Sequence, residues 1–131
     1  MTEIHQLIER YRATWEEVIR GDLPLATLDG FFHIPCFMVS IDGAMTLYAQ
    51  SADIRAFNQS RLDAFRGGGV RNAMLRGVDL QSQGPHVALA TVNWELSRAD
   101  GSLERAWRHY YTVLTGAGAP AFVVSAFQTG A

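Results

Sequence analysis

Apolar residues recur every three or four positions in the first part of the chain, which places them on one face of a helix. They are Ile4, Leu7, Ile8, Tyr11, Trp15, Val18 and Ile19. Thr2 is placed to cap the start of this helix, and Gly21 follows its last apolar residue, where helices commonly end. The pattern predicts an amphipathic helix over this segment.

The next segment predicts a second, shorter helix and then a hairpin. The helix is expected to start at Asp22, with a proline in the first turn, where proline is tolerated, and to stop at Gly30. Two runs rich in apolar and β-favouring residues, 36–41 and 44–48, flank an Asp-Gly dipeptide at 42–43. This dipeptide suits the positive φ angles of a tight turn, so the two runs are expected to pair.

The rest of the chain predicts one more helix and then a run of strands. Ser51 can cap this third helix, and the glycines at 67–69 end it. Four strands are expected at about 70–83, 86–98, 104–115 and 120–129. Helices followed by strands are typical of an α+β architecture with an antiparallel sheet. The chain has the length of one common domain and no linker, so a single domain over residues 1–131 is expected.

Composition narrows the classes of function. Charged residues make up 18% of the chain and hydrophobic residues 48%, whereas charged residues make up about 25% of an average soluble protein. This surplus of apolar residues is typical of a lined cavity or a subunit interface. The net charge is -2 and the basic residues are scattered, so they form no positively charged patch of the kind that binds nucleic acid, and no nucleic-acid partner is expected.

Cysteine use and targeting signals predict a cytoplasmic protein. The single cysteine, Cys36, allows no internal disulfide, and no Cys/His spacing matches a zinc site. The N-terminal segment lacks the pattern of a secretion signal. Residues 110–131 are uncharged, but glycine and proline interrupt them, which favours strands over a membrane helix. No metal, nucleotide or flavin motif is present in the sequence, so neither a metal nor a cofactor is expected.

The order of the elements and one sequence pattern resemble a known superfamily. A strand with a tryptophan, Val92-Asn93-Trp94-Glu95, precedes an Asp-Gly turn at 100–101, and a second such strand, Trp107-Arg108-His109-Tyr110-Tyr111, follows it. This pattern resembles the NTF2-like superfamily, and most of all its small bacterial SnoaL-like and nuclear-transport-factor-like members. The resemblance implies a cystatin-like cone, with three N-terminal helices and a short hairpin packed on a curved antiparallel sheet. It also implies an apolar cavity in the cone and homodimers that pair through the outer sheet face.

Alternation along two of the strands separates an inner from an outer face. One face of the strand 86–98 is entirely apolar and is expected to line the core or cavity, with Thr91, Asn93 and Glu95 looking outward. Its residues are Ala88, Ala90, Val92, Trp94 and Leu96. Both faces of the strand 104–115 carry groups capable of chemistry, so alternation leaves open which one lines a pocket. One face has Trp107, His109, Tyr111 and Val113, and the other has Arg108, Tyr110, Thr112 and Leu114.

Aromatic residues with polar tips are the candidates for a ligand site. Rings supply contact area and hydroxyl or imidazole groups supply orientation, which suits a small apolar or aromatic molecule. The candidate ligand-binding residues are Tyr11, Trp15, His33, Tyr48, Trp94, His109 and Tyr111. The same aromatic residues also fit a plain hydrophobic core.

The resemblance adds candidates for catalysis, because enzymes of this superfamily hold a histidine or a carboxylate as general base in the apolar cone. His33 and His109 are the candidate catalytic residues, and Asp29, at a helix end, is a weaker one. The alternative for His33 is a structural histidine that donates to a backbone carbonyl and fixes the turn before Pro35. Cys36 lies between apolar neighbours and is expected to be a packed thiol.

Three functions stay open. The first is binding of a small apolar or aromatic molecule in the cone pocket. The second is a SnoaL-like or ketosteroid-isomerase-like enzyme, with a histidine as base and Tyr11, Tyr48 or Tyr111 stabilising an enolate-like oxygen. The third is a homodimeric interaction module with a filled pocket. A homodimer through the sheet is compatible with all three.

Overall fold

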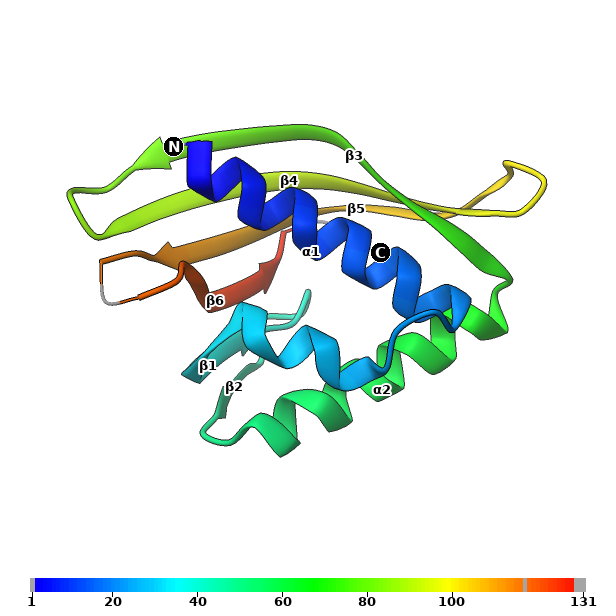
Figure 1. Ribbon diagram of the computed structural model, residues 1–131, viewed down its shortest axis with the longest axis horizontal. Coiled ribbons are helices and arrows are strands. Elements are labelled where there is room, and N and C mark those ends of the chain that lie inside the picture. The colour runs from blue at the N-terminus through cyan, green and yellow to red at the C-terminus, as the bar shows by residue number, and fades with distance from the viewer. Residues whose placement is uncertain (1, 117, 129–131) are drawn as a thin grey trace.

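The computed structural model describes residues 2–116 and 118–128 (Figure 1). The helical elements are α1 (Thr2–Arg20), the 3-10 helix η1 (Leu25–Phe31) and α2 (Ser51–Gly67). The strands are β1 (Phe32–Val39), β2 (Met45–Tyr48), β3 (Val70–Ser82), β4 (Val87–Arg98), β5 (Leu103–Leu114) and β6 (Ala121–Phe127). This order confirms the predicted α+β class and the place of the hairpin between the second and third helices.

The first helix lies where it was predicted, except that Thr2, the expected cap, is already its first helical residue, and the second helix differs from the prediction. α1 ends at Gly21, whose φ of 86° is left-handed and whose N–H donates to the Val18 carbonyl at 3.1 Å. The second helix is a 3-10 helix that begins at Leu25 instead of Asp22. The reason is Pro24, whose backbone is extended, with φ −70° and ψ 151°, so that it precedes the helix and lies outside its first turn.

The third helix agrees with the prediction except at its cap. Gln50 takes the cap position without a side-chain bond, and Ser51 is already helical, so the predicted cap at Ser51 is wrong. The glycines end α2 as expected, since the Gly68 N–H closes the last turn on the Ala64 carbonyl at 3.0 Å. No helix in the described part of the chain is both long enough and apolar enough to cross a membrane.

The strands form one sheet of six in the order β2-β1-β6-β5-β4-β3. β1 and β2 pair as the predicted hairpin, and Gly43 in its turn has a φ of 88°. β3 to β6 form the predicted antiparallel meander. β1, however, runs parallel to β6. Local alternation and turn residues do not reveal this pairing, because it joins strands that are far apart in the sequence.

The sheet is curved, and the helices pack on its concave side. Register shifts between Val70 and Asn72 and between Leu75 and Gly77 interrupt the pairing of β3 with β4, and such bulges bend a strand. Figure 1 shows β3 curving across the top of the view and descending toward the end of α2. α1 packs against β3 and η1, and α2 packs against η1. The sheet therefore wraps around the helices, as the cone prediction requires.

The concave face of the sheet carries the core. On β4, the predicted apolar face is buried throughout, and Thr91, Asn93 and Glu95 alternate with it, as expected. On β5, the buried face is the one that carries Trp107, His109, Tyr111 and Val113. The structure thus resolves the alternative that alternation left open for this strand.

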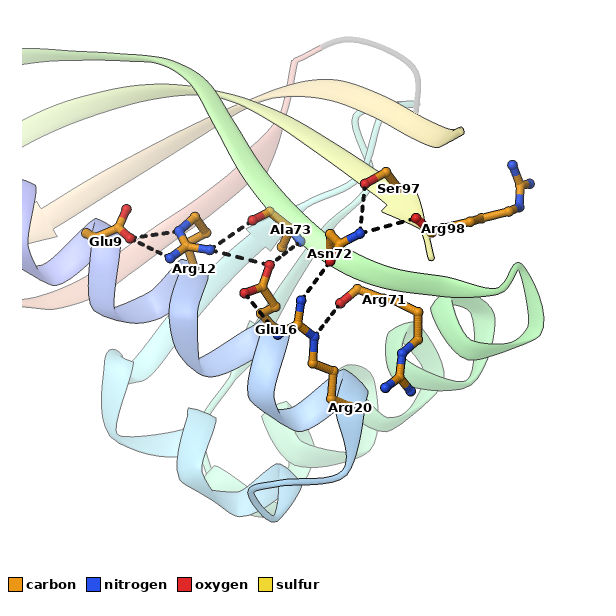
Figure 2. A network of polar contacts seen from close by, with 9 residues as sticks. All are labelled: Glu9, Arg12, Glu16, Arg20, Arg71, Asn72, Ala73, Ser97 and Arg98. Carbon is orange, nitrogen blue, oxygen red and sulfur yellow. Dashed lines mark hydrogen bonds and ion pairs between the residues drawn. The ribbon is translucent and has the colours of Figure 1, made fainter. Parts of the chain in front are cut away.

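Side chains of α1 bond to the outer edge of β3, the last strand of the sheet (Figure 2). Arg12 donates to the Ala73 carbonyl at 2.9 Å, and Glu16 accepts the Ala73 N–H at 2.9 Å. One turn further along, Arg20 donates to the Asn72 side chain at 2.7 Å. The bonds to Ala73 satisfy backbone groups that have no neighbouring strand, and together the three bonds fix α1 against this edge of the sheet.

Candidate functional site

A small cavity lies inside the cone between α1, α2 and the concave face of β4 and β5. This inner cavity is lined by Tyr11, Trp15, Ile19, Arg61, Phe65, Trp94, Leu96 and Trp107. Its volume is about 10 Å³, and a single water molecule needs roughly 10–15 Å³ on the same scale. The protein's own side chains therefore fill the interior of the cone almost completely.

A larger space opens on the outer side of the same residues. This outer pocket has a volume of about 230 Å³ and is lined by Phe57, Ser60, Arg61, Ala64, Phe65, Arg105, Trp107 and Phe127. Arg61, Phe65 and Trp107 line both spaces. These three side chains therefore form the partition between the two spaces.

Arg61 is the centre of this partition. Its guanidinium carbon lies 5.4–5.8 Å from the centroids of five aromatic rings, which come from both helices and from the last two strands. The rings belong to Trp15, Phe57, Phe65, Trp107 and Phe127. The attraction between a cation and an aromatic face contributes about 0.5–1 kcal/mol at an exposed site and about 2 kcal/mol when the pair is shielded from water. The aromatic groups thus hold the Arg61 side chain, which is half-buried, over the mouth of the cone.

Arg61 is not among the residues predicted from the sequence, although a local signal marks its position. Phe57, Arg61 and Phe65 follow one another at intervals of four residues in α2, which puts the charge in the middle of an aromatic stripe. A charged residue at such a position is unusual for a helix face that meets a core. Phe127 joins the pocket from β6, and no local sequence signal indicates that contact.

Three of the predicted ligand-binding residues, Tyr11, Trp15 and Trp94, line the inner cavity. Tyr111 lies beneath them, fully buried, and its hydroxyl accepts a hydrogen bond from the Trp94 indole N–H at 3.1 Å. Burial raises the pKa of Tyr11, while the nearby Arg61 charge acts in the opposite direction. Burial also raises the pKa of Tyr111 well above its usual value. Both phenols therefore stay protonated at neutral pH.

His109 is fully buried beside Tyr111, with the two rings stacked at 4.4 Å between centroids. The Trp107 indole N–H donates to Nδ1 of His109 at 3.1 Å, and Nε2 lies 2.7 Å from the Ser125 hydroxyl. Burial lowers the pKa of His109 well below its usual value, so the ring is neutral. An indole can only donate, so the proton of the neutral ring is on Nε2, which donates a hydrogen bond to the Ser125 hydroxyl.

The structure places His33 and Tyr48 away from both spaces. His33 is half-buried on β1, and its Nδ1 lies 3.0 Å from the Pro35 carbonyl, the kind of bond that the structural interpretation of this histidine predicts. Tyr48 is half-buried on β2, with its ring 5.9 Å from that of Phe57. Neither residue lines the inner cavity or the outer pocket.

Three further polar groups lie near the helices. Asn58 in α2 is fully buried, and neither atom of its amide has a hydrogen-bond partner among the described residues. Asp29 is partly buried and pairs with Arg55 through one oxygen, so it is not merely a solvated helix end. Burial raises the pKa of the Cys36 thiol to about 11, in agreement with a packed thiol.

Solved structures of similar fold come from several bacteria. An NTF2-like protein of unknown function from Shewanella oneidensis MR-1 has 13% identity and a TM-score of 0.73, with 98% of each chain covered. An NTF2-like protein with a cystatin-like fold from Novosphingobium aromaticivorans has 18% identity and a TM-score of 0.73, covering 97% of this chain and 79% of its own. A cystatin-like domain of unknown function from Nostoc punctiforme PCC 73102 has 16% identity and a TM-score of 0.72, covering 99% and 76%.

Identities at this level show the fold alone, and they confirm the predicted cystatin-like cone. No curated protein matches the chain. One family model, described as NTF2-like protein (DUF6841), matches residues 2–130. This match covers nearly the whole chain and confirms the resemblance expected from the tryptophan strands. The chain belongs to this family of NTF2-like proteins.

Proposed function

We propose that this protein binds a small aromatic or apolar molecule at the mouth of the cone. The observation that carries the proposal is the outer pocket of about 230 Å³, whose walls include Phe57, Phe65, Trp107 and Phe127. Drug-sized ligands occupy pockets of roughly 300–1,000 Å³. The smaller volume here fits a molecule of one or two rings. Stacking on flat aromatic walls would supply most of its binding energy.

Binding is better supported than catalysis by a histidine. A general base must reach the proton that it removes, with a free nitrogen. Both ring nitrogens of His109 are engaged, by Trp107 and Ser125, and the side chain is fully buried. His33 has its Nδ1 at the Pro35 carbonyl and lines neither space. A histidine-dependent isomerase or cyclase stays a prediction, and it would require His109 to give up one of these bonds.

Isothermal titration calorimetry with naphthalenemethanol, an uncharged aromatic probe, tests the proposal. The wild-type protein should bind it in a one-to-one ratio. Ala64→Trp fills the outer pocket from an exposed position on α2, so it should weaken binding by about tenfold or more. Ala56→Trp is the matched control, because Ala56 is exposed on the same helix and does not line the pocket. Absence of binding, or an equal effect of both variants, would reject the proposal.

We also propose that two copies pair through the outer face of the sheet. Support comes from exposed apolar side chains that share this face. Phe37 and Leu47 are 36% and 52% exposed and face each other in the hairpin, and Phe37 also lies beside Val124 of β6. Tyr110 of β5, 41% exposed, extends the same face beyond β6. Large contiguous apolar patches are rare on the surfaces of monomeric proteins, and they commonly mark protein–protein contacts.

Sedimentation equilibrium tests the pairing. The wild-type protein should have the mass of two chains, and Leu47→Glu should have the mass of one. Leu103→Glu is the control, because Leu103 is similarly exposed but lies at the start of β5 beside the turn. A wild-type protein that stays a monomer at high concentration would reject the homodimer.

A further inference from the structure

Arg61 is a half-buried cation that lacks an acidic partner within the described part of the chain. Among the described residues, five other arginines pair with a carboxylate, for example Arg12 with Glu9 and Arg55 with Asp29. No described Asp or Glu places an oxygen within 4.0 Å of the Arg61 guanidinium. Removing a cation from water is costly unless a counter-charge or hydrogen-bond acceptors replace the water. The surrounding rings and the Tyr11 hydroxyl, which accepts a hydrogen bond from the Arg61 guanidinium, offset only part of this cost.

The outer pocket has a positive, aromatic character. Its lining contains two guanidinium groups, from Arg61 and Arg105, and the hydroxyl of Ser60, but no carboxylate. Arg105 has Glu104 as a partner at 2.7 Å and lies over the Phe65 ring at 5.2 Å. Arg61, which has no carboxylate partner among the described residues, is therefore the cation in this pocket with which an incoming anion can pair. The planar guanidinium of an arginine can donate two parallel hydrogen bonds to the two oxygens of a carboxylate, which a lysine ammonium cannot do as well.

The aromatic groups around Arg61 also argue against a cationic ligand. Cages of aromatic rings commonly bind cations from outside the protein, such as quaternary ammonium groups. Here the protein's own guanidinium already occupies the cage, within 5.8 Å of five ring centroids. A second cation would be repelled by Arg61. An anion with a flat ring could instead pair with the Arg61 guanidinium and stack on the aromatic side chains.

We propose that the ligand of this pocket is a small aromatic carboxylate, with its carboxylate paired to Arg61 and its ring against Phe57, Trp107 and Phe127. The inference rests on the proposed function, because it names the chemical class of the molecule bound at the same place. Arg61 is the residue that determines the preference for an anion. The aromatic walls would bind charged and uncharged rings alike.

Calorimetry with naphthoate and naphthalenemethanol separates the two proposals, because the probes share a ring system and differ in charge. The wild-type protein should bind naphthoate about tenfold tighter or more, the usual scale for a charge-assisted hydrogen bond. Arg61→Met should remove this preference, so that it lowers the affinity for naphthoate at least about tenfold more than the affinity for the alcohol. Arg61→Lys, which keeps the charge without the planar fork, should keep part of the preference. Circular dichroism and thermal unfolding of each variant establish that it is folded.

Arg10→Met is the matched control, because Arg10 is exposed on α1 and lines neither space, yet its loss changes the net charge equally. The control should keep the full preference for naphthoate. Equal binding of the two probes by wild type, or an equal loss in Arg10→Met and Arg61→Met, would overturn the carboxylate inference alone. Failure of both probes to bind would overturn the proposed function and the inference with it.

Discussion

The indole N–H of Trp107 donates to Nδ1 of His109 across 3.1 Å. This bond leaves Nε2 as the protonated nitrogen of the neutral imidazole, and the Ser125 hydroxyl accepts a hydrogen bond from Nε2 at 2.7 Å. A second proton on His109 would have to go to Nδ1, where it would face the donating indole. The contact therefore opposes protonation in the same direction as burial does.

The first prediction concerns acid stability. The folded state lowers the pKa of His109 through burial, while the unfolded chain has an ordinary histidine pKa of about 6.5. Below that pH the unfolded state binds the extra proton, so the free energy of unfolding falls as pH falls. The contribution of His109 to this slope is up to about 1.4 kcal/mol per pH unit. Urea unfolding from neutral to mildly acidic pH should therefore show a shallower slope for His109→Gln.

The control for that experiment is His5→Gln. His5 is exposed on α1, and its replacement should leave the pH slope of the wild-type protein unchanged. If His109→Gln and wild type lose stability in parallel as pH falls, His109 is already protonated in the folded protein. That result would contradict the neutral ring inferred from its hydrogen bonds.

The second prediction concerns thiol reactivity. A rise in the pKa of Cys36 from 9.0 to about 11 lowers its thiolate fraction about 100-fold near neutral pH, and burial further blocks access. Labelling with a disulfide reagent such as Ellman's reagent should therefore be at least about 100-fold slower in the native protein than in urea. Equal labelling rates in the two states would show that Cys36 is accessible.

The third prediction concerns Asn58. An amide buried without hydrogen-bond partners costs about 1–3 kcal/mol, and leucine has a similar size without polar atoms. Asn58→Leu should therefore raise the free energy of unfolding by about 1–2 kcal/mol in urea denaturation. Gln59→Leu, on the exposed side of α2, should change it by less than about 0.5 kcal/mol. A less stable Asn58→Leu protein would mean that the amide is hydrogen-bonded in solution.

The fourth prediction concerns the contact between α1 and β3. Glu16→Ala removes the acceptor of the Ala73 N–H, so a backbone donor loses its partner. The expected loss in the free energy of unfolding is about 1–2 kcal/mol, measured in urea. Glu17→Ala, at the exposed neighbouring position, should have little effect. Equal values for the two variants would show that water replaces Glu16 at no cost.

Much of the fold could be predicted because its signals are local. The apolar spacing from Ile4 to Ile19 defined α1, and alternation from Ala88 to Leu96 defined both a strand and its buried face. The η1 helix was misjudged because the sequence does not show whether Pro24 enters a first turn or precedes it. The parallel pairing of β1 with β6 depends on the packing of the whole sheet.

The candidate site was predicted only in part, for a similar reason. Tyr11, Trp15 and Trp94 lie on faces that helical or strand periodicity assigns to the interior, and they line the inner cavity. Arg61 was assigned to no site, although it lines both the inner cavity and the outer pocket. Its role depends on rings such as Trp107 and Phe127, which reach it from distant strands. Only the tertiary structure brings these groups together.

The two edges of the sheet differ in a way that bears on how copies of this chain meet. Exposed edge strands invite strand addition and open-ended aggregation. At one edge, β2 is only four residues long and offers a short template. At the other edge, β3 is bent by two register shifts, and Arg12 and Glu16 occupy the backbone groups of Ala73. Growth through the edges is thus hindered on both sides, which disfavours open-ended fibres.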